Sequence, residues 1–219
     1  MEQFLQLFTD PASFPIWGIA GSILVLSGCI IPSLRYKGRQ GQRFSPLNHF
    51  ISELGERNVS GYARVFNLSL VVAGLLFVMY MIQFGFFLGT TPALTAAGIG
   101  VFSALSCIMV GVFPMDTKKK HDDAAMCFFY GGLATILLFG LSSLLDVQHR
   151  LPMVFILFAV LVALAFAAFI LLPALTPKSG VKLDRFGIDR PRIWPLPLVE
   201  WLAMVGVVGW IAAVSLYFI

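Results

Sequence analysis

Six stretches of predominantly apolar residues recur along the chain, each about 20 residues long, the length that spans the hydrocarbon core of a bilayer as a helix. They predict an all-α, polytopic membrane protein that forms one bundle of six transmembrane helices, a single domain over residues 1–219. Only 12% of the residues are charged, whereas a soluble domain carries about a quarter. The expected spans are about residues 15–34, 64–85, 92–113, 124–145, 152–172 and 195–218.

The basic residues predict how the chain is oriented. Of the 15 Lys and Arg residues, only Arg150 lies outside three of the five connections. The other 14 are Arg35, Lys37, Arg39, Arg43, Arg57, Arg64, Lys118, Lys119, Lys120, Lys178, Lys182, Arg185, Arg190 and Arg192. Because positive loops remain in the cytoplasm, we expect a protein of the cell (inner) membrane with both termini on the non-cytoplasmic side. Charges confined to short loops indicate membrane lipids as partners and no nucleic acid, and they leave the oligomeric state open.

The first long connection contains the segment Ser45–Arg57, with the sequence SPLNHFISELGER. Ser45 followed by Pro46 is typical of a helix start, and Gly55 is typical of a helix end. Between them, apolar residues recur at helical spacing, namely Leu47, Phe50, Ile51 and Leu54. Polar residues recur at the same spacing on another face, namely His49, Ser52, Glu53 and Glu56. The pattern predicts a short amphipathic helix over Ser45–Leu54, lying at the cytoplasmic interface.

Two interpretations of this helix are open. In the first, it is a strut that joins the first two spans. In the second, His49 acts as a general base oriented by Glu53, one helical turn away, or takes part in a metal site. Ser52 is a candidate nucleophile, although its position three residues from His49 on a short helix is more often incidental.

Further polar residues are expected on the same side of the membrane. Asp116 and His121 lie in the connection between the third and fourth spans, whereas Asn67 and Glu200 lie inside the second and sixth spans. A carboxylate inside a span is costly and faces the bundle interior or a water-filled cavity. We therefore expect the polar groups of the first two cytoplasmic loops to converge on one mouth of the bundle.

A zinc site built from all three histidines is excluded by this topology. His149 is expected in a loop on the opposite membrane face from His49 and His121. The hydrocarbon core is about 30 Å thick and zinc–nitrogen bonds are about 2 Å long, so the three side chains cannot share one ion. A metal held by His49 and His121 with carboxylates remains open, but no metal or other cofactor is expected.

Several short motifs support a family resemblance over most of the chain. They are His49-x-Ile51-Ser52-Glu53-Leu54-Gly55, Phe66-Asn67, Phe113-Pro114-x-Asp116 and His121. At these positions the chain resembles the domain-of-unknown-function 998 (DUF998) family of six-span prokaryotic membrane proteins. More distantly, the serine–acid–glycine loop is similar to that of DRAM-like membrane proteins and GPI-anchor lipid-remodelling proteins. The resemblance implies a six-helix fold and a shared polar site, with no established activity.

The leading functional hypothesis is an integral membrane protein that binds lipid in a polar pocket at its cytoplasmic mouth. The candidate lining consists of His49, Ser52, Glu53, Asn67, Asp116, His121 and Glu200. Arg57 and Arg64 are candidates to hold a lipid phosphate through charge-assisted hydrogen bonds. The first alternative is a membrane-embedded lipid-modifying enzyme, a hydrolase or an acyltransferase, that uses His49, Glu53 and His121. The second alternative is a small transporter, which the absence of a broken-helix pair in the sequence disfavours.

Overall fold

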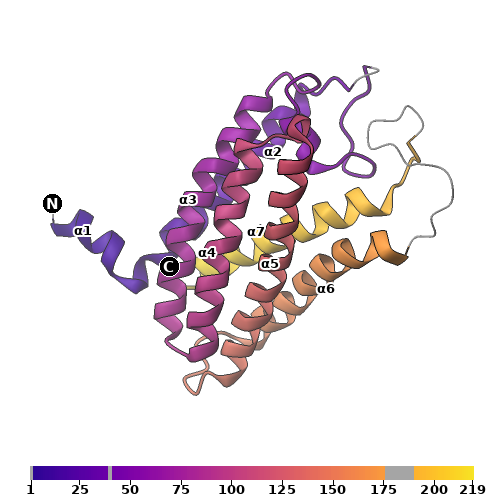
Figure 1. Ribbon diagram of the computed structural model, residues 1–219. Coiled ribbons are helices and arrows are strands. Elements are labelled where there is room, and N and C mark those ends of the chain that lie inside the picture. Colours follow the sequence, from indigo (N-terminus) through magenta and orange to yellow (C-terminus); the bar gives the residue numbers. More distant parts are fainter. Residues whose placement is uncertain (1, 39–40, 176–189) are drawn as a thin grey trace.

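Six long apolar helices form the computed structural model, which describes residues 2–38, 41–175 and 190–219 (Figure 1). Their bounds are α2 Phe14–Leu34, α3 Ala63–Leu88, α4 Thr91–Val112, α5 Lys119–Leu145, α6 Met153–Leu175 and α7 Pro195–Tyr217. This confirms the predicted all-α, six-span bundle. Helix α5 begins earlier than expected, at Lys119, and α3 continues to Leu88. Four basic residues used in the topology argument lie outside the described residues, namely Arg39, Lys178, Lys182 and Arg185.

The helix ends follow from local sequence. Pro15, Pro92 and Pro195 occupy first-turn positions, where the missing N–H would have no partner within the helix. Between α3 and α4, Gly89 adopts a left-handed conformation with φ of 66°, which ends α3. The Thr90 hydroxyl then accepts a hydrogen bond from the Ala93 N–H at 3.2 Å. These residues turn the chain into a tight hairpin.

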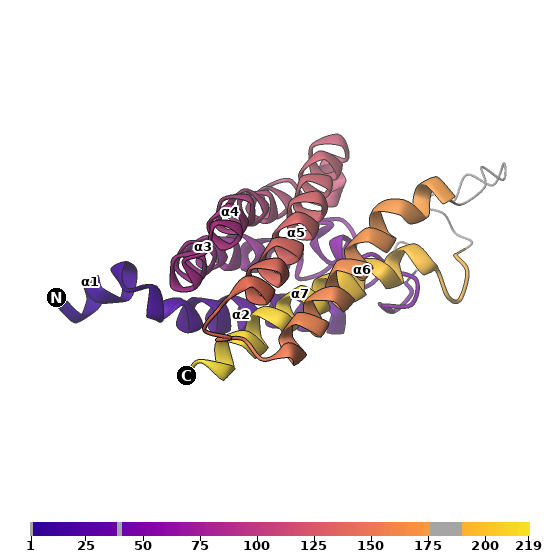
Figure 2. The same cartoon turned by 90° about the horizontal axis from the view of Figure 1, so that it is seen from below.

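The six helices close into a ring around an interior space. Each helix packs against the next in the chain, and α7 packs against α2. Figure 2 shows α2 and α7 crossing next to each other on one side of the molecule, with α3 and α4 on the other. A glycine lets the backbones of α3 and α4 approach each other closely. A Cβ atom at Gly111 of α4 would lie 2.5 Å from the Asn67 carbonyl oxygen of α3.

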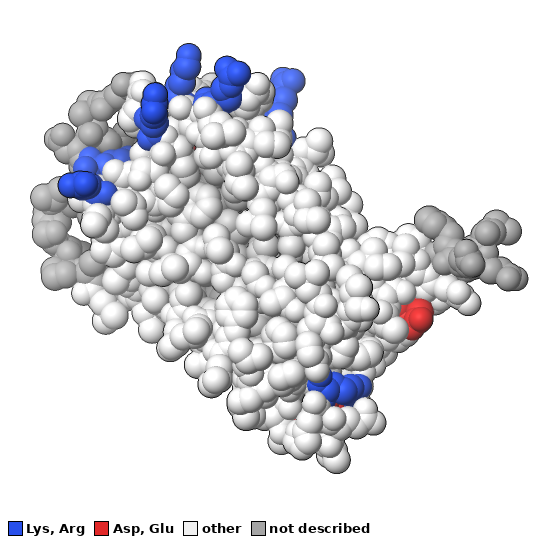
Figure 3. All heavy atoms as spheres, turned by 180° about the vertical axis from the view of Figure 1, so that it is seen from behind, with Lys and Arg blue, Asp and Glu red and all other residues white. Residues whose placement is uncertain are grey.

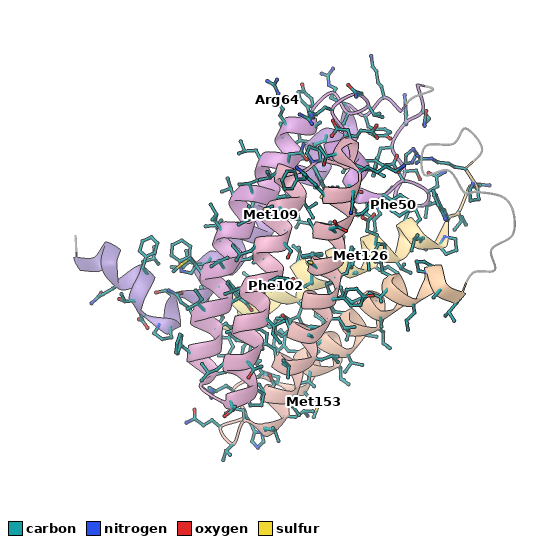
Figure 4. All side chains as sticks on the ribbon, viewed as in Figure 1. Phe50, Arg64, Phe102, Met109, Met126 and Met153 are labelled. Carbon is teal, nitrogen blue, oxygen red and sulfur yellow. The ribbon has the colours of Figure 1, made fainter. Side chains whose placement is uncertain are left out.

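The outer surface of the ring is apolar. The face drawn in Figure 3 has a broad middle zone without Lys, Arg, Asp or Glu, and most of its basic residues gather at one end. We call this end, which carries Arg35, Lys37, Arg43, Arg57 and Arg64, the basic end. In Figure 4, Arg64 lies at the basic end and Met153 near the opposite end, whereas Phe102 and Met109 lie on the outside of α4. Phe102 is 53% exposed, as expected for a side chain that faces lipid.

The opposite end of the bundle is fastened by the α5–α6 connection. Asp146 bonds to Arg150 at 3.0 Å. The Arg150 guanidinium also donates to the carbonyl oxygens of Phe87 and Leu88. These oxygens lie in the last turn of α3, where carbonyl groups lack a partner within the helix. A short helix that was not predicted from the sequence, α1 over Glu2–Thr9, projects from the bundle in Figure 1.

The predicted amphipathic helix over Ser45–Leu54 is wrong. The chain forms a turn at residues 46–48 and then a short 3-10 helix, η2, over Ile51–Gly55. Two carboxylates take the backbone donors that an α-helix would use: the Phe50 N–H donates to Glu53 and the Ile51 N–H donates to Glu200, each at 2.8 Å. Nor is the segment divided into a lipid face and a water face. Leu47, from the apolar set, is 44% exposed, whereas Ile51, Leu54, His49, Ser52, Glu53 and Glu56 are all buried.

Candidate functional site

The segment from Ser45 to Arg57, which we call the cap, closes the basic end of the helix ring. Its 3-10 helix η2 packs against α2, α3 and α7, and against a second 3-10 helix, η3, over Met115–Thr117. The Ser52 hydroxyl lies 3.6 Å from the sulfur of Met115. The Asn67 side chain donates to the Gly55 carbonyl oxygen at 3.0 Å. The structure therefore brings together the two loops that sequence reasoning expected to converge.

Glu53 is the electrostatic centre of the cap. Its side chain is 3% exposed, and its two oxygens lie 2.8 and 2.9 Å from one guanidinium nitrogen of Arg190. The Tyr36 hydroxyl donates to the same carboxylate at 2.9 Å. Burial, and then the neighbouring Glu53 charge, raise the pKa of Tyr36, so its hydroxyl stays protonated as a donor. Glu53 therefore ties the cap to the segment after α2 and to the segment before α7.

His49 is buried beside this carboxylate. Its ring centroid lies 5.3 Å from those of both Tyr36 and Phe44, and its Nδ1 lies 3.2 Å from the backbone N and O of Ser45. Burial is the main cause that lowers the pKa of His49, so the imidazole is neutral at pH 7. The hydrogen bonds described for Glu53 go to Tyr36, Arg190 and the Phe50 backbone rather than to this ring.

Helix α7 holds the cap from the other side. Glu200 is 8% exposed and accepts the Ile51 N–H. The next residue, Trp201, donates its indole N–H to the His49 carbonyl oxygen at 3.1 Å. The costly carboxylate inside the last span therefore has a backbone partner in the cap, as its position in an apolar helix requires.

Arg57, Asp116 and Arg64 lie at the outer edge of the cap. Arg57 pairs with Asp116 at 2.9 Å, and its side chain is 56% exposed. Arg64 is exposed at the basic end (Figure 4). Tyr36 and Arg190 were not predicted as site residues. Each lies in a basic, polar loop, where the spacing of residues does not show which side chains are buried and which are solvated.

Behind the cap lies an interior cavity with a volume of about 110 Å³. Ser52, His121 and Glu200 line it close to the cap. The His121 Nδ1–H donates to the Phe113 carbonyl oxygen at 2.8 Å, which fixes the ring. The rest of the lining is nearly all apolar and comes from all six long helices.

The cavity is long in the direction of the helix axes. Its lining on α5 extends from His121 to Phe139, 18 positions, which corresponds to about 27 Å at the helical rise. The far end is closed by three packed rings, with centroid distances of 4.8 Å for Phe84–Phe139, 6.0 Å for Phe84–Trp210 and 6.2 Å for Phe139–Trp210. The space is therefore a blind apolar channel with polar groups at one end.

The candidate residues do not form a metal site. Within residues 2–38, 41–175 and 190–219, no three His, Cys, Asp or Glu side chains are grouped closely enough to hold an ion. His121 lines the cavity, whereas His49 is packed between the rings of Tyr36 and Phe44.

Comparison with known proteins identifies the family. The family model described as "Protein of unknown function (DUF998)" matches residues 16–217. The chain belongs to the DUF998 family. The match includes the six long helices almost completely, together with the cap and η3 of this DUF998 protein. No curated protein and no solved structure matches the chain.

Proposed function

We propose that this DUF998 protein binds a single-chain amphiphile inside its helix ring, with the polar head under the cap and the chain in the channel. The observation that carries the proposal is the channel itself, which is apolar along its length, closed at its far end and polar beside the cap. Apolar pockets with a few convergent polar groups are typical of small-molecule sites. A volume this small spread over about 27 Å leaves room for one chain at most.

The polar end favours an uncharged head that carries hydroxyl groups. Ser52 supplies a hydroxyl and Glu200 supplies carboxylate oxygens, which accept hydrogen bonds. A phosphate at this end would lie beside the Glu200 carboxylate, and like charges in a low-dielectric environment repel strongly. Monoacylglycerols and long-chain alcohols have the required chemistry.

Binding is better supported than catalysis by His49 and Glu53. Both oxygens of Glu53 are engaged with Arg190, Tyr36 or the Phe50 backbone, and His49 is absent from the channel lining. The packed aromatic rings at the far end also support binding over transport, because a transported solute needs a route through both faces of the bundle.

The test is a pair of substitutions on α7. Val207 lines the channel, whereas Val205, two residues earlier, is 46% exposed on the outer face. The purified proteins are titrated with 1-oleoylglycerol and bound probe is counted by native mass spectrometry. We expect Val207→Phe to bind at least tenfold more weakly than wild type, because the larger ring occupies the channel, and Val205→Phe to bind normally. Equal binding by all three proteins would contradict the proposal.

A further inference from the structure

A second concave surface opens on the outside of the bundle at the basic end. It lies between the last turns of α2, residues 35–37 and 41–46, and Trp201 of α7, and has a volume of about 860 Å³. We call it the α2 groove. It shares no lining residue with the interior channel. Its occupant can therefore differ from that of the channel.

The α2 groove combines an apolar wall with a basic rim. Leu26, Ile30 and Leu34 line the wall at intervals of four residues, on one outward face of α2, and are 39%, 58% and 78% exposed. The rim follows directly where α2 ends, with the exposed side chains of Arg35, Lys37 and Arg43. Within the described part of the chain, none of these three cations forms an ion pair with a carboxylate.

Two aromatic residues complete the boundary between wall and rim. Phe44 and Trp201 both line the groove, and their rings meet edge to face with centroids 5.8 Å apart. Aromatic side chains are enriched at the level of lipid headgroups, where their apolar bodies and polar edges are both satisfied. The wall, the aromatic pair and the basic rim thus follow the order of acyl chain, glycerol region and headgroup in a phospholipid.

We propose that the α2 groove binds an anionic phospholipid of the surrounding membrane, with its phosphate among Arg35, Lys37 and Arg43 and its acyl chain along Leu26, Ile30 and Leu34. Charge complementarity selects an anionic headgroup over a zwitterionic one. Guanidinium groups bind phosphate oxygens through paired charge-assisted hydrogen bonds, and the lysine adds a third positive charge. The proposal is independent of the channel, whose polar end has the opposite preference.

The experiment uses the full-length protein in detergent, titrated with dioleoyl phosphatidylglycerol or dioleoyl phosphatidylcholine and measured by native mass spectrometry. The groove variant is Arg35→Gln, Lys37→Gln, Arg43→Gln. The control, Lys118→Gln, Lys119→Gln, Lys120→Gln, removes the same charge from the basic end but outside the groove. Because each basic residue near an anionic lipid contributes a several-fold effect, the groove variant should bind phosphatidylglycerol roughly a hundredfold more weakly. The control should bind it as wild type does.

Three outcomes would overturn the proposal: equal binding of the two lipids by wild type, undiminished binding by the groove variant, or an equal loss in the control. Wild type alone gives a further check, since its phosphatidylglycerol binding should weaken with added salt, and salt-independent binding would also refute it. Soluble glycerol phosphate at the same concentration should not displace the lipid; displacement would assign the site to free phosphate. Binding of 1-oleoylglycerol should be unchanged in the groove variant, so this proposal and the channel proposal fail separately.

Discussion

Substitution of Glu53 by Gln should destabilise the protein more than any other single change at the cap. The carboxylate is 3% exposed and Arg190 is 12% exposed, so the pair is largely removed from water. Glu53→Gln removes the Glu53 charge from beside the Arg190 guanidinium, and it replaces one acceptor oxygen by an NH₂ donor among groups that themselves donate. Breaking one side of a buried ion pair costs about 3–5 kcal/mol, because the remaining charge is buried without compensation.

The matched control is Asp116→Asn. It breaks an ion pair of similar length, 2.9 Å, whose arginine is 56% exposed, so its cost should be below about 1 kcal/mol. The free energy of unfolding is measured for purified protein in mixed micelles by titration with SDS, followed by circular dichroism. A double variant with Arg190→Gln should recover part of the loss, because it removes the positive charge that Glu53 offsets. The reasoning is refuted if Glu53→Gln costs no more than Asp116→Asn.

Three further predictions concern the bundle. Gly111→Ala should lower the free energy of unfolding by about 2 kcal/mol, because the new Cβ would lie 2.5 Å from a backbone oxygen of α3. Gly98→Ala on the same helix meets nothing within 4 Å and should be neutral or slightly stabilising; equal costs in the same SDS titration would contradict the packing argument. The hydrogen bond from Arg150 lowers the pKa of Asp146 from 3.8 to about 2, so its stabilisation is complete above about pH 4 and is lost as the pH falls through about 2. Asp146→Asn should accordingly cost about 2 kcal/mol at pH 7 and markedly less at pH 3, whereas a cost independent of pH would rule out the charge as its source. Reporter fusions after Gly89 and at the C-terminus should both report a non-cytoplasmic location, and a cytoplasmic signal from either would reverse the proposed orientation.

The transmembrane architecture could be predicted because it depends on composition over long windows. Lipid imposes the same apolar requirement on every outward position, and helices such as α6 satisfy it, with a mean hydropathy of 3.2 over an 18-residue stretch. The resemblance to the DUF998 family was confirmed by the family match over residues 16–217.

The backbone conformation of the cap could not be predicted, because it depends on hydrogen bonds from the backbone to side chains. Periodicity at Ser45–Leu54 matched an amphipathic helix, but Glu53 and Glu200 capture the N–H groups of Phe50 and Ile51. One of these carboxylates is 149 positions distant in sequence, and no local pattern reports it. The same limit explains why Arg190 was missed as the partner of Glu53, whereas Glu200 was found from the cost of a charge inside a span.

The most direct test of the central claim uses the tryptophan at the blind end of the channel. Trp210 lines the channel, is 2% exposed and is held by a 2.9 Å hydrogen bond from its indole N–H to the Phe155 carbonyl oxygen. The acyl chains of the surrounding bilayer therefore cannot touch the Trp210 indole, whereas an acyl chain inside the helix bundle would touch it. Bromine atoms on an acyl chain quench tryptophan fluorescence on contact, so a monoacylglycerol brominated at the end of its chain, 1-(17,18-dibromostearoyl)glycerol, is the appropriate probe.

The measurement compares fluorescence quenching by this probe in wild type and in Trp210→Phe, both reconstituted in unlabelled lipid. We expect a saturable loss of fluorescence in wild type that is absent from Trp210→Phe, and no such component when brominated phosphatidylcholine replaces the single-chain probe. The same fractional loss in wild type and Trp210→Phe would mean that no chain reaches the end of the channel, and would contradict the account.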